Sequence, residues 1–191
     1  MKTDPEIELM LRFKNGDEGA FQRLFNLYRK PMVNFCYRFC GDRAAAEDLA
    51  QDVFIRVYRA AGGYEATARF STWIYRIAVN VCLNEFRSRK RKPVITSMDQ
   101  PAVGTGDRPA EYPDHRTPSA DEALAAGQRD EWLRAAFQRL PERQRMALML
   151  RTFHEFSYDE IAGQMMISTA NVKTLIFRAR EQLKEMLAHP V

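Results

Sequence analysis

The sequence predicts an all-α protein made of two small helical domains joined by a flexible linker. Apolar residues recur every three or four positions, and neither half of the chain shows a convincing alternation of polar and apolar residues. Residues 93–122 hold five of the nine prolines, two glycines and almost no large apolar residues, so they cannot form a core. We therefore expect domains over residues 1–92 and 123–191, with a Pro-rich acidic linker over 93–122.

The first long helix is predicted from about Phe21 to Phe39, where its stripe of apolar residues reaches Gly41 and Asp42. Pro31 lies inside this stripe and is expected to restart or kink the helix. A second helix is predicted from about Ala44 to Ala61, ending at two glycines. Its apolar face is Ala46, Ala50, Val53, Phe54 and Val57, and its opposite side carries Asp48, Gln51, Asp52, Ile55 and Arg59.

A third helix is predicted to begin near the cap-like Ser71, and it has one ordinary and one unusual side. Ile74, Ile77, Ala78 and Val81 form the stripe that should face the core. The unusual side is a polar ridge in which residues recur at spacings of three or four: Trp73, Arg76, Asn80, Asn84, Arg87 and Arg91. Either Trp73 takes part in binding on this ridge, or the preceding loop covers it.

In the second domain a helix from about Glu122 should stop at Pro141, and Met146, Met149, Leu150 and Phe153 give the next helix its stripe. Ser157 and Glu160 have the spacing of a capping box, in which each side chain satisfies a free amide at a helix start. A short break over residues 165–167 follows, and Ser168 can cap a last helix that runs to about Ala188. This pattern predicts a helix-turn-helix.

The last helix predicts a DNA-binding surface. Its core side is Val172, Leu175, Ile176, Ala179, Leu183 and Leu187, whereas Ala170, Lys173, Thr174, Phe177 and Arg178 point away. An exposed aromatic ring can pack on a thymine methyl, and lysine, threonine and arginine can reach bases or phosphates.

Composition and charge favour a protein that binds a polyanion. Residues 1–92 carry a net charge of +6, the linker −4 and residues 123–191 +2, although a solvated surface also accounts for a modest excess. No run of about 18 apolar residues occurs, and the N-terminal ten residues include Asp4, Glu6 and Glu8 where a signal peptide would be basic and then apolar. We expect the protein to act in the cytoplasm.

Catalysis, cofactors and metals are not predicted. The sequence has no Gly-rich phosphate loop and no His-carboxylate cluster, and it offers no spacing typical of metal ligands, so we expect neither an enzyme nor a small-molecule substrate. Cys36, Cys40 and Cys82 are expected to be reduced and mostly buried thiols. The alternative, in which Cys36 and Cys40 hold half of a zinc site, lacks a second pair of ligands.

These motifs together resemble the extracytoplasmic-function (ECF) sigma factors, the small two-domain bacterial initiation factors. FQRLFNLYRKPM, GDRAAAEDLAQDVFIRVYRA and FSTWIYRIAVNVCLNEFRSRKRK are similar to the helices of sigma region 2, in order and at family-like spacing. LPERQRMALMLRTFHEFSYDEIA followed by STANVKTLIFRAREQL is similar to region 4. A helix-turn-helix alone is weak evidence, but both blocks in one chain joined by a Pro-rich linker are strong evidence.

The resemblance implies a role for each surface. Asp48, Gln51, Asp52 and Ile55 would dock on the β′ clamp of core RNA polymerase, unless they form a merely solvated acidic face. The minus-10 promoter element would meet Tyr64, Arg69, Trp73, Arg76, Asn80, Asn84 and Arg87. The minus-35 element would meet Ser168, Ala170, Lys173, Thr174, Phe177 and Arg178. The family also implies contact of region 4 with the β flap, a linker that threads through the polymerase, and a membrane-linked anti-sigma factor as a partner.

Two positions depart from the family pattern. Met166 stands where the turn usually has glycine, which predicts a less tight turn, and Leu175 borders the core where many relatives have arginine. The remaining alternative is a stand-alone helix-turn-helix regulator, which would bind its operator without polymerase.

Overall fold

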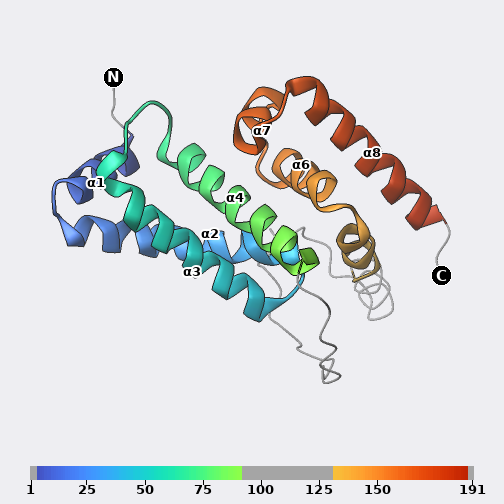
Figure 1. Cartoon of the computed structure of the whole chain (residues 1–191), viewed down its shortest axis with the longest axis horizontal. Coiled ribbons are helices and arrows are strands. Elements are labelled where there is room, and N and C mark those ends of the chain that lie inside the picture. The colour runs from blue at the N-terminus through green and yellow to red at the C-terminus, as the bar shows by residue number, and fades with distance from the viewer. Residues whose placement is uncertain (1–3, 92–130, 189–191) are drawn as a thin grey trace, which may run out of the picture.

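The computed structural model of the chain describes residues 4–91 and 131–188, and within these ranges all regular structure is helical. This confirms the predicted all-α class, while the predicted linker lies outside the described residues. The N-terminal domain consists of α1 (Pro5–Lys14), α2 (Glu18–Cys40), α3 (Arg43–Ala60), the short 3-10 turn η1 (Ala61–Gly63) and α4 (Phe70–Arg91), shown in Figure 1.

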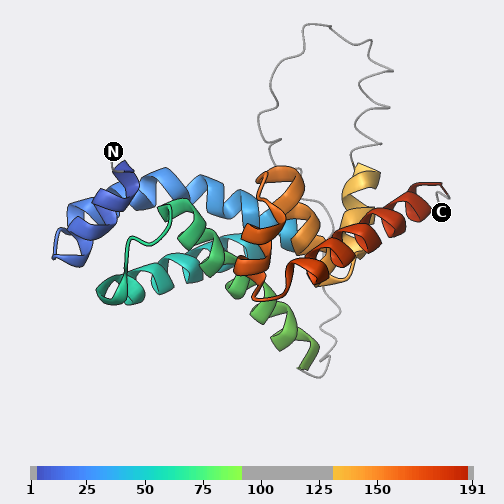
Figure 2. The ribbon, with the colours of Figure 1, turned by 90° about the horizontal axis from the view of Figure 1, so that it is seen from above.

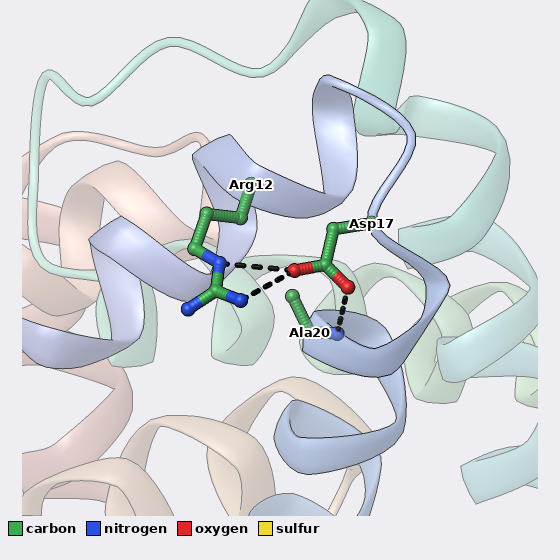
Figure 3. A network of polar contacts seen from close by, with 3 residues as sticks. All are labelled: Arg12, Asp17 and Ala20. Carbon is green, nitrogen blue, oxygen red and sulfur yellow. Dashed lines mark hydrogen bonds and ion pairs between the residues drawn. The ribbon is translucent and has the colours of Figure 1, made fainter.

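Aspartates fix where the first helices begin. Asp17 caps α2 by accepting a hydrogen bond from the Ala20 amide at 3.2 Å, and its other carboxylate oxygen accepts from Nε of Arg12 at 3.0 Å and from Nη2 at 2.6 Å (Figure 3). The hydrogen bond from Arg12 is the main cause that lowers the pKa of Asp17. Asp4 likewise caps α1, a helix that the periodicity of the sequence did not predict.

Helix α2 runs unbroken through Pro31, so the expected restart does not occur. It ends at Gly41, whose φ of 76° is the left-handed conformation in which glycine has no steric penalty. The Gly41 amide donates to the Tyr37 carbonyl at 2.8 Å and closes the last turn.

The second domain is a helix-turn-helix, as predicted. Residues 131–139 are helical, and they are followed by α6 (Glu142–Phe153), α7 (Tyr158–Met165) and α8 (Thr169–Ala188). The capping box forms, with the Ser157 amide donating to Glu160 Oε2 at 2.8 Å and the Glu160 amide to Ser157 Oγ at 3.2 Å. Met166 itself adopts the left-handed conformation, with φ at 51°. The turn therefore forms as it would with glycine, although this conformation costs a residue with a Cβ about 1 kcal/mol.

The two domains pack against each other through α4, which the sequence did not predict. Helix α4 lies between α2 and α3 on one side and α6 and α7 on the other, as Figures 1 and 2 show from two directions. Besides most of its predicted stripe, α4 buries Val79, Cys82 and Leu83. Its apolar surface is therefore wider than one domain alone requires.

Candidate functional site

The outward side of α3 presents a polar surface with one apolar residue among its acids. We call Asp48, Gln51, Asp52 and Ile55 the docking face, and the structure places all four side chains at the exposed surface of α3. Ile55 is 46% exposed. Asp52 lies 3.5 Å from Arg56 in an ion pair that is itself open to solvent and so adds little stability. An apolar side chain rimmed by carboxylates suits a partner surface that is apolar at its centre and basic at its edge.

Tyr58 extends the docking face and was missed in the sequence. It lies one turn beyond Ile55 on α3, is about half exposed, and its hydroxyl donates to Glu18 at 3.1 Å. Its ring packs on Phe13 and Phe21, with centroids at 5.1 and 5.3 Å. The signal available in the sequence was its position three residues after Ile55, on the same side of the helix.

The polar ridge of α4 forms largely as predicted. Arg76, Asn84 and Arg87 are exposed and Asn80 is half-buried, while Arg69 is exposed in the loop before the helix. The side chains of Arg89, Lys90 and Arg91 lie outside the described residues. The ridge combines guanidinium groups for phosphates with amides that can bond base edges.

Trp73 and Tyr64 do not present two free rings. Tyr64 is only 2% exposed, and its ring meets Trp73 edge-on with centroids 4.9 Å apart. Trp73 itself is half-buried and also packs on Phe70 at 5.8 Å. The expectation that Tyr64 contacts DNA is therefore corrected, because a ring this buried supports its neighbour rather than meeting a ligand.

On α8, the side chains that were predicted to point away from the core are exposed. Ala170, Lys173, Thr174 and Arg178 are exposed, and Phe177 is 64% exposed. Ser168 is exposed too, and its hydroxyl caps the helix by accepting from the Asn171 amide at 3.3 Å. The Thr174 hydroxyl donates to the Ala170 carbonyl at 3.1 Å, so its hydrogen is already engaged within the helix. Leu175 is half-buried against the core, as expected.

Thr169 was missed in the sequence and fixes α7 relative to α8. Its hydroxyl donates to Asp159 Oδ1 at 2.8 Å, which links the first turn of one helix to that of the other. Such a bond helps to hold α8 at a fixed angle to α7.

The described residues contain no group of three or more histidine, cysteine or acidic side chains arranged to hold a metal ion. Cys36 and Cys82 are free, buried thiols with their sulfur atoms 3.9 Å apart, and Cys40 is half-buried. Within residues 4–91 and 131–188, none of the helices combines the length and apolar character needed to cross a membrane.

Comparison with known proteins matches both domains to one family. The Sigma-70 region 2 model matches residues 24–92, and the Sigma-70 region 4 model matches residues 130–183. The RNA polymerase sigma-H factor of Pseudomonas aeruginosa is 35% identical over 190 residues, which cover 98% of this chain and 96% of that protein. The ECF sigma factor SigW of Bacillus subtilis is 32% identical, over 91% of this chain and 92% of its own length. The chain belongs to the ECF sigma factors.

Solved structures agree on the fold of this sigma factor. CnrH, in complex with the cytosolic domain of CnrY, has a TM-score of 0.67 at 18% identity and covers 99% of this chain and all of its own. The sigma factor RpoE of Bartonella quintana, in complex with the anti-sigma factor NepR, has a TM-score of 0.64 at 23% identity, over 90% of this chain and 98% of its own. The region 2 match contains the docking face and the polar ridge, and the region 4 match contains the exposed surface of α8.

Proposed function

We propose that this ECF sigma factor binds core RNA polymerase in the cytoplasm and directs it to promoters, acting as an initiation factor rather than an enzyme. The observation that supports the proposal best is that one chain carries three exposed surfaces. These are the docking face on α3, where an apolar side chain lies among acidic ones, and two separate polar surfaces on α4 and α8. A factor that joins polymerase to two promoter elements needs one surface for each contact.

The docking face is the proposed contact with the β′ clamp. Ile55 and the half-exposed Tyr58 supply apolar area at its centre, and Asp48 and Asp52 supply charge at its rim. Buried apolar anchors carry most of the energy of such interfaces, while rim charges set orientation and association rate.

The polar ridge of α4 is the proposed contact with the minus-10 element. Single-stranded bases stack on rings and their phosphates pair with arginine, each stack contributing about 1–3 kcal/mol. Asn80 lies mid-ridge, where an amide can hold an extruded base, and exposed Arg87 lies toward the other end, where it can meet duplex phosphate.

The surface of α8 is the proposed contact with the minus-35 element, with the family's β flap as a further region 4 contact. The first half of a recognition helix enters the major groove, and there Lys173, Phe177 and Arg178 are exposed. We also propose an anti-sigma factor, membrane-linked as is typical of the family, as a partner that holds the factor inactive. The solved relatives in complex with CnrY and NepR support this.

Binding of labelled promoter DNA to the chain, with and without core polymerase, tests the proposal in a filter-binding assay. We expect weak binding by the chain alone and specific binding only after core is added. Tight, palindrome-dependent binding by the chain alone would instead identify a stand-alone helix-turn-helix regulator.

The substitutions Lys173→Ala and Arg178→Ala should each weaken binding of the holoenzyme to its promoter by about 1–3 kcal/mol if the side chains contact bases. Sequence preference at the minus-35 element should relax at the same time, which a set of single-base promoter variants measures. Lys184→Ala is the matched control, because Lys184 is an exposed lysine further along α8. A uniform loss across all promoter variants would assign the contact to phosphate, and no loss would remove these residues from the interface.

A further inference from the structure

Helix α1 holds the backbone at the entry to the loop that leads into α4. Lys14 Nζ, at the C-terminal end of α1, donates to the Tyr64 carbonyl at 2.9 Å, although the two residues are 50 positions apart. A charged donor makes a stronger hydrogen bond than a neutral one, and a carbonyl in a loop lacks the regular partner that a helix would give it. The bond therefore fixes one flank of residues 65–69, which we call the α4 loop.

The other flank of the α4 loop is also tied to α1, through Tyr28 of α2. The Tyr28 hydroxyl donates to Glu6 Oε2 at 2.5 Å, and the Tyr28 ring packs on Phe70 with centroids 5.3 Å apart. Phe70 is buried and is the first residue of α4. Both flanks of the loop are thus connected to α1, one directly through Lys14 and the other through Tyr28.

The α4 loop itself is exposed along its whole length. All five of its residues are exposed, and within it the Thr67 amide donates to the Glu65 carbonyl at 2.9 Å. On the entry side, a Cβ at Gly62 or Gly63 would meet no atom within 4 Å beyond its chain neighbours, so packing does not hold the chain there. Glycine also has the greatest backbone freedom of any residue. The position of the loop therefore depends on its two flanks.

Tyr64 connects α1 to the polar ridge of α4. Helix α1 lies against η1 and α4, as Figures 1 and 2 show from two directions. The Tyr64 ring is almost fully buried and meets Trp73 edge-on with centroids 4.9 Å apart. Burial, and then the charge of Asp4 at the start of α1, raise the pKa of the Tyr64 hydroxyl. Tyr64 therefore contacts α1 through Lys14 and contacts the ridge through Trp73, so the position of α1 determines where the ridge begins.

We propose that α1 positions the minus-10 site, and that Lys14 is the positioning residue that sets where the α4 loop meets the melted strand. Helix α1 precedes residues 24–92, which match the region 2 model. A loop binds its ligand precisely when neighbouring residues hold it in one position. Lys14 acts here through the Tyr64 backbone rather than by touching DNA. The consequence for promoter selectivity rests on the proposed function, whereas the anchoring of the loop does not.

Hydrogen exchange of the full chain, followed by NMR without polymerase or DNA, tests the anchoring. The Tyr64 and Trp73 amides lie on either side of the loop and donate to the Ala61 and Arg69 carbonyls at 3.1 and 3.2 Å, so their exchange reports local opening. Lys14→Ala should speed exchange of the Tyr64 amide about two- to tenfold, the factor that one hydrogen bond contributes. Lys14→Arg keeps a charged donor and should exchange as wild type does.

Lys30→Ala is the matched control, because Lys30 is an exposed lysine of α2 and its loss makes the same change in charge. Tyr28→Phe is a second variant, which keeps the ring on Phe70 and removes the bond to Glu6. It should speed exchange at the other flank, at the Trp73 amide. Circular dichroism should show wild-type helical content in every variant. If Lys14→Ala and Tyr28→Phe both exchange at the rate of Lys30→Ala, the anchoring is overturned.

Open-complex formation by the holoenzyme on a set of single-base promoter variants tests the consequence. Lys14→Ala should reduce discrimination between the natural and the substituted bases of the minus-10 element about two- to tenfold. Discrimination at the minus-35 element and affinity for core should stay unchanged, and Lys14→Arg should restore the selectivity. A lysine that only stabilised the fold would lower the amount of active protein without changing these ratios.

Three other outcomes have distinct meanings. A uniform loss on all promoters, with the dependence of log K on log salt lowered by about one, would show that Lys14 itself neutralises a phosphate and would overturn the positioning role. Unchanged selectivity in a Lys14→Ala variant whose loop exchanges faster would overturn it as well. Failure of the wild type to bind core or promoter would contradict the proposed function, and with it the consequence for selectivity, but would leave the hydrogen-exchange result standing.

Discussion

The double substitution Asp52→Arg, Ile55→Ala is expected to weaken binding of the sigma factor to core polymerase by about 100-fold or more, which is roughly 3 kcal/mol. Ile55 is the exposed apolar centre of the docking face, so its truncation removes the contact area that a polymerase surface would bury. Reversing the charge of Asp52 places a guanidinium against a partner that we expect to be basic at its edge. Co-elution with core in gel filtration, followed by titration, measures the loss.

Folding should survive this change. Both side chains are exposed, and the ion pair between Asp52 and Arg56 is a solvated pair of small value. Glu47→Arg is the control for charge, because it makes the same reversal on α3 about 140° around the helix from Asp52. If the double variant still co-elutes with core while its helical content is unchanged, the docking face is not the contact with polymerase. Equal loss in Glu47→Arg would show that charge alone, and not this surface, governs binding.

The local features of the fold were predictable from sequence because they depend on neighbouring residues. Ser157 and Glu160 form their capping box wherever the helix starts, and the exposed side of α8 follows from its period of 3.6 residues. The same holds for the docking face, whose four residues recur on one side of α3. Even Met166 takes the conformation that the turn requires, since the helices on either side determine it.

The features that were missed depend on contacts between distant residues. Helix α1 is only ten residues long, and it is fixed by Asp4 and by packing on α2. The burial of Tyr64 against Trp73 is a loop contact that no periodicity records. The hydrogen bonds between the two domains join residues about 100 positions apart, and their donors, Gln138 and Arg145, look like ordinary polar residues in the sequence. Only the unusually wide apolar surface of α4, with Val79 and Leu83 outside the first stripe, hinted at a second covered side.

Substitutions at the two ends of the polar ridge should have different effects on stability and on promoter binding. Trp73→Ala should destabilise the first domain by about 2–4 kcal/mol, because the ring packs on Tyr64 and Phe70 and its truncation leaves a cavity. Trp73→Phe keeps an aromatic ring there and should restore most of that stability. Thermal unfolding followed by circular dichroism measures both changes.

Asn80→Ala should leave unfolding nearly unchanged yet reduce the open complex on duplex promoter, because an amide that holds an extruded base acts only once the strands have parted. Arg87→Ala should instead weaken the closed complex and lower the dependence of log K on log salt by about one, because one fewer phosphate is neutralised.

A pre-melted bubble template separates a defect in base capture from a defect in strand melting. Lost base capture persists on the bubble, so Asn80→Ala should remain defective there, whereas a variant impaired only in melting recovers. If Trp73→Phe is stable and recovers on the bubble while Asn80→Ala does not, the ring drives melting and the amide captures the base. If Trp73→Phe behaves as wild type on both templates, Trp73 serves the first domain as a packing residue and the ridge binds DNA through its polar side chains alone.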